Sequence, residues 1–167
     1  DTKVDNDKVK EMVACAMEKG INYYDTAWGY HGGNSELAMG EALSAYPRES
    51  FYLADKFPGH QIVKGVKKLD PKTIFEEQLK KCGVEYFDFY LLHNINEHSM
   101  SYYGNPENKY LDYFLEQKAN GRIKHLGFSC HSAAEGLEQF LQMCGDKMEF
   151  CQIQLNYLDW TLQNAKK

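Results

Sequence analysis

The stretch Phe87-Asp88-Phe89-Tyr90-Leu91-Leu92-His93 is the part of the sequence that decides the fold. It is apolar almost without interruption, which is typical of a β-strand that other elements cover on both faces. Such strands occur mainly in parallel sheets, where each strand is joined to the next by a helix. The segments on either side of residues 87–93 should therefore alternate between helix and strand.

The predicted elements do alternate along the chain. Five short β-prone segments are predicted, over residues 21–25, 51–57, 87–93, 123–129 and 150–157. Helical patterns occupy residues 7–20, 35–46 and 72–82, a segment from Leu111 to about Gly121, and a segment around Leu137 to Cys144. This alternation predicts an α/β fold of parallel βαβ units with right-handed crossovers, in one domain over residues 1–167.

The helix boundaries carry their own signals. Asp70-Pro71 supplies an N-cap and a first-turn proline for the helix at 72–82, and Gly83 closes it. The chain stops at residues 164–167, about where we expect a further helix to begin.

Composition excludes several classes of protein. The chain has 167 residues, 43% hydrophobic and 14% aromatic, and a net charge of −5. An acidic chain without a lysine or arginine block is not expected to bind nucleic acid or a membrane surface. No apolar run is long enough to span a membrane, the first twenty residues do not resemble a signal peptide, and we expect a cytoplasmic protein. The five cysteines are odd in number and lack a C-x-x-C pair, which favours reduced core thiols over disulfides or a metal site.

The first four predicted strands each carry a polar group at the carboxyl end. These groups are Asp25, Lys56, His93 and Ser129, and Gln152 lies on the fifth strand. The carboxyl ends of parallel strands lie on one edge, so these side chains should converge there. Tyr30 follows on the loop after Asp25, and together the residues form a set that can handle protons.

The residue types in this set suit the reduction of a carbonyl. A tyrosine ionises near pH 10, so it acts as an acid at neutral pH only with help from a nearby cation. Lys56 can supply that charge, Asp25 can hold the lysine, and His93 can hydrogen-bond a substrate oxygen while Tyr30 delivers the proton. None of these groups carries a hydride, so a cofactor is required.

The same residues resemble the aldo-keto reductase family. Gly20-Ile21-Asn22-Tyr23-Tyr24-Asp25-Thr26-Ala27, followed by Tyr30 and Asn34-Ser35-Glu36, is similar to the family signature in which the catalytic tyrosine lies five residues after the aspartate. Lys56 in LADKF and His93 in FDFYLLH resemble its catalytic lysine and histidine. The likeness continues through residues 121–129 (GRIKHLGFS) and 151–157 (CQIQLNY).

The resemblance implies a TIM-type (β/α)₈ barrel that reduces a small-molecule carbonyl substrate with NADPH, or with NADH, and without a metal. Tyr30 would donate the proton, and Lys56 with Asp25 would adjust the pKa of Tyr30. His93 would orient the carbonyl. Ser129 and Gln152 would bind the nicotinamide carboxamide, and Asp25 would lie near the ribose. Many members of the family have an asparagine directly after the serine that corresponds to Ser129, where this chain has Cys130. The sequence at residues 127–131 is most similar to that of the branch of the family whose members often carry an iron–sulfur-binding tail after the barrel.

Length conflicts with a complete barrel. A (β/α)₈ barrel takes about 250 residues, and the five predicted strands correspond to strands two to six of the family pattern. We therefore expect an incomplete barrel with open edges at residues 21–25 and 150–157, which favour self-association. Three explanations stay open: a fragment of a longer protein, a truncated gene product, or a chain that a partner completes. We expect the isolated chain to bind NADPH poorly and to be catalytically weak.

Other interpretations of single residues also stay open. A non-catalytic, cofactor-binding regulatory subunit on the same scaffold is the alternative to an enzyme. The loop at residues 29–33 lacks the spacing of a phosphate cradle. Asp55 should face the helix layer and Asp88 should be structural. Nothing in the sequence indicates a functional role for His60 or His98.

Overall fold

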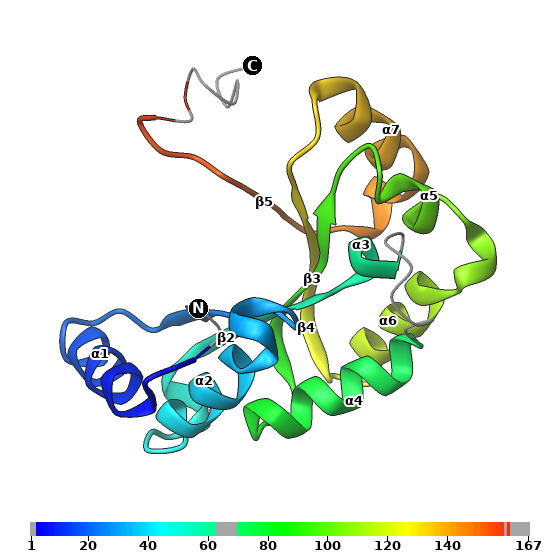
Figure 1. The fold of residues 1–167 in the computed structure, drawn as a ribbon. Coiled ribbons are helices and arrows are strands. Elements are labelled where there is room, and N and C mark those ends of the chain that lie inside the picture. Colours follow the sequence, from blue (N-terminus) through cyan, green and yellow to red (C-terminus); the bar gives the residue numbers. More distant parts are fainter. Residues whose placement is uncertain (1–2, 63–69, 159, 161–167) are drawn as a thin grey trace.

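The computed structural model describes residues 3–62, 70–158 and 160, and its centre is one five-stranded sheet. The strands are β1 (Tyr23–Asp25), β2 (Tyr52–Phe57), β3 (Phe87–Ile95), β4 (Ile123–Cys130) and β5 (Cys151–Ile153). They pair in sequence order, and every pair is parallel. The sheet curls into part of a barrel with its helices on the outside (Figure 1), which confirms the predicted incomplete barrel.

Helices connect the strands. The longer ones are α1 (Asn6–Glu18), α2 (Ser35–Leu43), α4 (Pro71–Cys82), α6 (Tyr110–Ala119) and α7 (Ala134–Cys144). Two four-residue helices, α3 (Gly59–Ile62) and α5 (Met100–Tyr103), lie in the loops after β2 and β3. The described connections also contain four 3₁₀ segments: η1 (Tyr30–Gly33), η2 (Arg48–Ser50), η3 (Pro106–Asn108) and η4 (Gly145–Lys147).

The ends of α4 are those that the sequence predicts. The carboxylate of Asp70 accepts a hydrogen bond from the backbone N–H of Thr73 at 2.8 Å, which satisfies one of the unpaired donors of the first turn. Gly83 adopts a left-handed conformation at φ 66°, where a side chain would be strained. Local chemistry therefore sets both boundaries of this helix.

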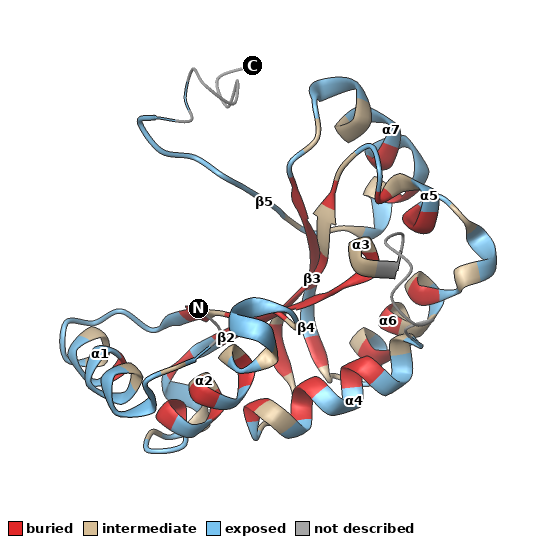
Figure 2. Ribbon diagram, viewed as in Figure 1, coloured by how far each residue is buried: buried red, intermediate tan, exposed pale blue. Residues whose placement is uncertain are grey.

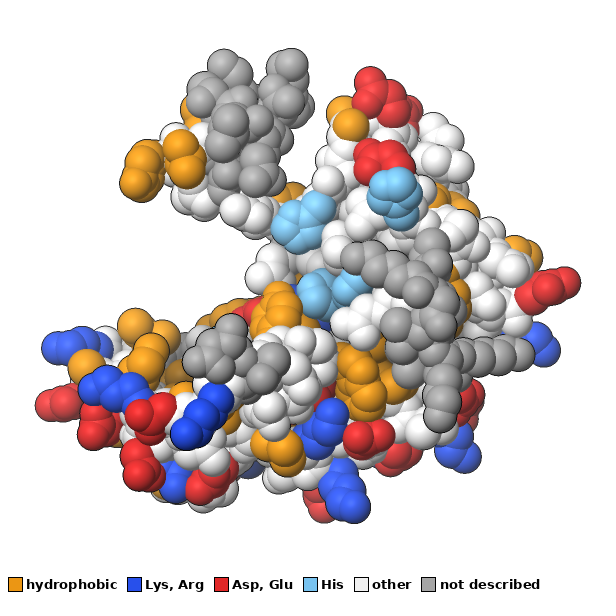
Figure 3. All heavy atoms as spheres, in the orientation of Figure 1, with side chains coloured by type: hydrophobic (Ala, Val, Ile, Leu, Met, Phe, Trp, Pro, Cys, Tyr) orange, Lys and Arg blue, Asp and Glu red, His pale blue; other side chains and the backbone are white. Residues whose placement is uncertain are grey.

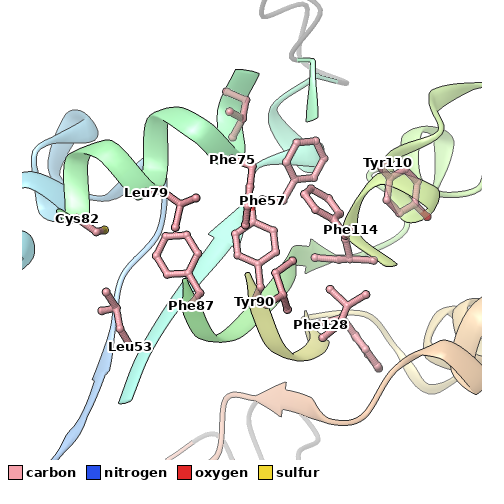
Figure 4. Close-up of a cluster of buried hydrophobic side chains, with 14 of the residues drawn as sticks. Leu53, Phe57, Phe75, Leu79, Cys82, Phe87, Tyr90, Tyr110, Phe114 and Phe128 are labelled. Atoms are coloured by element: carbon pink, nitrogen blue, oxygen red, sulfur yellow. The ribbon is translucent and has the colours of Figure 1, made fainter. Parts of the chain in front are cut away.

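The main core lies between the convex face of the sheet and the helices. Phe57, Phe75, Phe87, Tyr90 and Phe114 are completely buried there, and their rings form a continuous cluster (Figure 4). Figure 2 shows the buried residues concentrated on β2, β3, β4 and the inward sides of the helices. Burial of apolar surface is the dominant favourable term in folding, and these aromatic side chains contribute to it.

The strand register places the predicted site residues on one face. Asp25 pairs with Ala54, two residues before Lys56. Lys56 pairs with Leu91, two residues before His93. Because side chains alternate along a strand, positions two apart share a face. The same step leads from Leu91 through Gly127 to Ser129, which pairs with Gln152, so all five predicted residues belong to the concave face.

The concave face also carries an aromatic layer below these residues. The ring of Phe89 lies 5.3 Å from that of Tyr23 and 5.4 Å from that of Phe150, and it stacks on His125 at 5.2 Å. Tyr23 remains 41% exposed, and β5 is exposed throughout (Figure 2). Within the described residues, β1 pairs only with β2 and β5 only with β4.

Two details differ from the predictions, and one prediction is not tested. The last strand covers residues 151–153 rather than 150–157, because β4 ends at Cys130 and offers no partner beyond Ile153. The helices α3 and α5 were not expected, since one turn is too short to show an apolar period. The helix expected near residues 164–167 lies outside the described residues. None of the helices among the described residues combines the length and apolarity needed to cross a membrane.

Candidate active site

Lys56 and Asp25 form the base of the candidate site. The ammonium group of Lys56 is 2% exposed and makes an ion pair with Oδ1 of Asp25. It also donates a hydrogen bond to the backbone carbonyl of Thr26 at 2.8 Å. A buried ammonium is tolerated only where such partners replace its water. The other carboxylate oxygen of Asp25, Oδ2, is buried without a hydrogen-bond partner among the described residues.

Tyr30 stands at the rim above this pair, on the 3₁₀ segment η1. Its ring centroid lies 5.0 Å from Nζ of Lys56 and 5.6 Å from the ring centroid of His93. The backbone turns sharply after it, with left-handed conformations at His31 (φ 51°) and Gly32 (φ 66°). Tyr30 is 40% exposed, so the phenol remains accessible to a substrate while its ring lies beside Lys56 and His93.

His93 sits where β3 departs from regular pairing, between Leu92 and Ile95. Burial first, and then the nearby His60, Lys56 and His131, lower the pKa of its imidazole from 6.5 to about 3. The ring is therefore neutral at physiological pH and has one N–H to donate. The hydroxyl of Tyr103 donates to the carbonyl of His93 at 2.9 Å and to that of Phe57 at 3.2 Å, which fastens the ends of β3 and β2 together.

A buried polar network lies behind Lys56, on the convex side of β2. Asp55 and Glu36 are both completely buried, and their carboxyl groups are close enough to interact electrostatically. Burial first, and the charge of Glu36 second, raise the pKa of Asp55 well above its usual range. Gln78 donates to Glu36 at 3.0 Å and to the carbonyl of Lys56 at 3.1 Å. The network therefore fixes the backbone that carries the lysine, and Asp55 faces the helix layer as predicted.

Asp88 has a structural role, as the sequence predicts. Its carboxylate accepts hydrogen bonds from Arg48 at 2.5 Å and from the backbone N–H of Leu53 at 2.9 Å. Arg48 lies on η2, in the loop before β2, and its guanidinium also covers the Tyr86 ring at 3.9 Å. The contacts of Asp88 join the start of β2 to β3, remote from the rim.

Ser129 and Gln152 are direct partners across β4 and β5. The hydroxyl oxygen of Ser129 accepts a hydrogen bond from the backbone N–H of Asn94 at 2.8 Å, so its own hydrogen remains available to another acceptor. Gln152 is exposed. Together with the unpartnered Oδ2 of Asp25, these groups fit the amide and hydroxyl chemistry of a nicotinamide nucleotide.

His60 is a neighbour of the site that the sequence did not reveal. Its ring lies edge-on to that of His93, with 4.7 Å between the centroids. The only signal in the sequence is its position four residues after Lys56, which indicates nothing until the turn of α3 is known. Among the described residues, no group of three or more His, Cys, Asp or Glu side chains is arranged to hold a metal ion.

The structure thus brings Asp25, Tyr30, Lys56 and His93 into one contact set, and it places Ser129 and Gln152 together on the same concave face. The space-filling view shows histidine side chains gathered in the hollow of the curved sheet (Figure 3). A phenol next to a cation and a neutral imidazole is an arrangement that can pass a proton to a bound oxygen.

Comparisons with known proteins identify the family of the chain. The model of the Aldo/keto reductase family matches residues 1–167. The chain is 29% identical to the NADH-specific methylglyoxal reductase of Escherichia coli, over 98% of this chain and 52% of that protein. It is 28% identical to the NADPH-dependent alpha-keto amide reductase of Saccharomyces cerevisiae, over 93% of this chain and 48% of that protein.

Solved structures show the same likeness. A thermostable aldo-keto reductase in complex with the inhibitor epalrestat superposes with a TM-score of 0.70 and 25% identity, covering 90% of this chain and 51% of that one. An aldo/keto reductase from Brucella melitensis, at 24% identity and a TM-score of 0.67, shares the fold over 97% of this chain and 60% of its own. The chain spans about half the length of the curated relatives it matches.

Proposed function

This chain belongs to the aldo/keto reductase family, and on that premise we propose that the protein containing it reduces a small carbonyl compound to an alcohol with NADPH or NADH. The observation that carries the proposal is the contact set of Tyr30, Lys56 and His93, with Asp25 paired to the lysine. Three strands and a loop contribute these residues.

Each residue has a chemical task in this proposal. Tyr30 donates its hydroxyl proton to the carbonyl oxygen as the alcohol forms. The ammonium of Lys56 stabilises the negative charge left on the phenol, and Asp25 holds that ammonium in place. The neutral ring of His93 donates a hydrogen bond to the same carbonyl oxygen and so orients the substrate against Tyr30.

The cofactor follows from what these residues lack. No side chain stores a hydride, and a nicotinamide nucleotide supplies one when it is bound. Ser129 and Gln152 are suited to hydrogen-bond the carboxamide, and Oδ2 of Asp25 is suited to accept from a ribose hydroxyl. One relative is named NADH-specific and another NADPH-dependent, so both cofactors belong in the test.

The proposal concerns the protein that contains this chain, because the chain spans about half the length of its relatives. The 167-residue chain alone is expected to bind NADPH weakly. A fluorescence titration that gave the isolated chain an affinity in the micromolar range would contradict this expectation.

The test of the function measures the loss of absorbance at 340 nm with a small aldehyde or ketone, with NADPH and NADH in parallel, and identifies the alcohol formed. Methylglyoxal is a suitable first substrate, because the Escherichia coli relative is named for it. Cofactor binding without turnover of any carbonyl would favour the non-catalytic regulatory subunit instead.

A further inference from the structure

The short helix α3 contacts three parts of the candidate site through three consecutive residues. Gly59 faces the ring of Tyr103, and a Cβ atom at this position would lie 2.5 Å from a ring carbon. His60 packs edge-on against His93, with 77° between the ring planes. The side-chain amide of Gln61 packs against Gly29, next to Tyr30, so closely that a Cβ there would lie 2.5 Å from its nitrogen.

These contacts fix where the ring of His60 can be. Gly59 and Pro58 are buried, and the Tyr103 hydroxyl binds the carbonyls of both Phe57 and His93. The chain that leads into α3 is therefore tied to the end of β3, and the approach of the His60 ring to His93 results from close packing.

The ring of His93 is consequently held from two sides. Tyr30 lies at 5.6 Å and 80°, and His60 at 4.7 Å and 77°, both in edge-to-face geometry. Ring torsions of histidine are broad when nothing packs against them. Because Nδ1 of His93 has no hydrogen-bond partner among the described residues, we infer that packing against the two neighbouring rings limits the rotation of the imidazole.

We propose that His60 is a positioning residue for the carbonyl reduction: its ring clamps the imidazole of His93 edge-on against Tyr30, so that the N–H of His93 points to the substrate oxygen. The consequence for the rate rests on the proposed function, whereas the clamp itself is a property of the fold. The groups that face His93 are the phenol of Tyr30 on η1, the ammonium of Lys56 on β2, His60 on α3 and His131 after β4.

The test compares His60→Ala, which removes the ring, with His60→Phe, which keeps one, and uses His98→Ala as the matched control because the side chain of His98 is exposed. In the protein that contains this chain, His60→Ala should lower kcat of carbonyl reduction about tenfold, with a smaller change in KM, because His93 loses its orientation. His60→Phe should recover most of that loss, and His98→Ala should change neither constant. An unchanged kcat in His60→Ala would overturn the proposal.

A second readout does not depend on activity. The ring protons of His93, assigned by their absence in His93→Asn, are followed by NMR as the pH is lowered. In His60→Ala the titration midpoint of His93 should rise toward 6.5, because water reaches the ring, and in His60→Phe it should rise less. An identical midpoint in parent and His60→Ala would overturn the clamp. If no carbonyl is reduced at all, the proposed function fails. The titration then still tests whether the ring of His60 packs against that of His93. His60→Gln replaces His60→Ala in both measurements if the alanine variant does not fold.

Discussion

The ammonium nitrogen of Lys56 lies 5.0 Å from the centre of the Tyr30 ring while it is paired with Asp25. The Tyr30 ring therefore lies beside a cation whose side chain is only 2% exposed and which is held by Asp25. An interaction of this kind is stronger at low dielectric than it would be in water. Several testable consequences concern this pair and the residues that support it.

The losses of stability on removing Lys56 and on removing Asp25 should be coupled. Lys56→Met leaves a carboxylate that is 27% exposed without its cation, and this should cost about 2 kcal/mol or more of the free energy of unfolding. The double variant Asp25→Asn/Lys56→Met should lose less than the sum of the two single losses. Urea unfolding of the four proteins measures the coupling, and strictly additive losses would show that the pair does not interact.

The stability of the protein should depend on pH through His93. Its pKa is about 3 in the folded chain, against the ordinary 6.5, so between these values the unfolded state binds a proton that the folded state does not. The contribution of the neutral His93 to the free energy of unfolding is at its maximum above pH 6.5. It is lost as the pH falls toward 3, by up to about 1.4 kcal/mol per pH unit. His93→Asn should flatten the unfolding free energy between pH 6.5 and 5, and His98→Ala should not. Equal slopes in all three proteins would contradict this.

Asp55 should show the opposite dependence. Its pKa is raised well above 3.8 in the folded chain, so the folded state holds a proton that the unfolded state releases as the pH rises above 3.8. The contribution of Asp55 to stability is therefore greatest below that pH and falls above it. Asp55→Asn cannot titrate, and its melting temperature relative to the parent should rise from pH 4 to pH 8. A difference that is constant with pH would mean that Asp55 is ionised in the fold.

Tyr103→Phe should weaken both the fold and the site. The variant keeps the ring that packs on Gly59, but two backbone carbonyls, those of Phe57 and His93, lose their donor. The expected cost is about 1–3 kcal/mol of unfolding free energy, together with a lower kcat because the end of β3 is released. Tyr157→Phe is the control, since Tyr157 is 95% exposed. If both variants unfold at the same denaturant concentration, the bridge contributes nothing.

Much of the architecture could be predicted from sequence because it depends on local signals. Asp70, Pro71 and Gly83 define α4 by capping chemistry, and the apolar run at residues 87–93 predicts β3. The convergence of Asp25, Lys56 and His93 followed from the topology of parallel strands alone.

Other features depend on contacts between distant segments. The length of β5 is set by where β4 ends, which no property of residues 150–157 indicates. The approach of His60 to His93 is produced by the packing of Tyr103 against Gly59, and the proton held by Asp55 depends on Glu36, nineteen positions away on another element.

The most direct test of the account is the rate of carbonyl reduction in Tyr30→Phe, measured by absorbance at 340 nm in the protein that contains this chain, beside the parent and Tyr157→Phe. Loss of the hydroxyl should lower kcat by about 10² to 10⁴, with an unchanged melting temperature because Tyr30 lies at the exposed rim, while Tyr157→Phe keeps the parental rate. Equal rates in the parent and in Tyr30→Phe would show that the phenol is not the proton donor and that the residues gathered at this edge do not form the catalytic site.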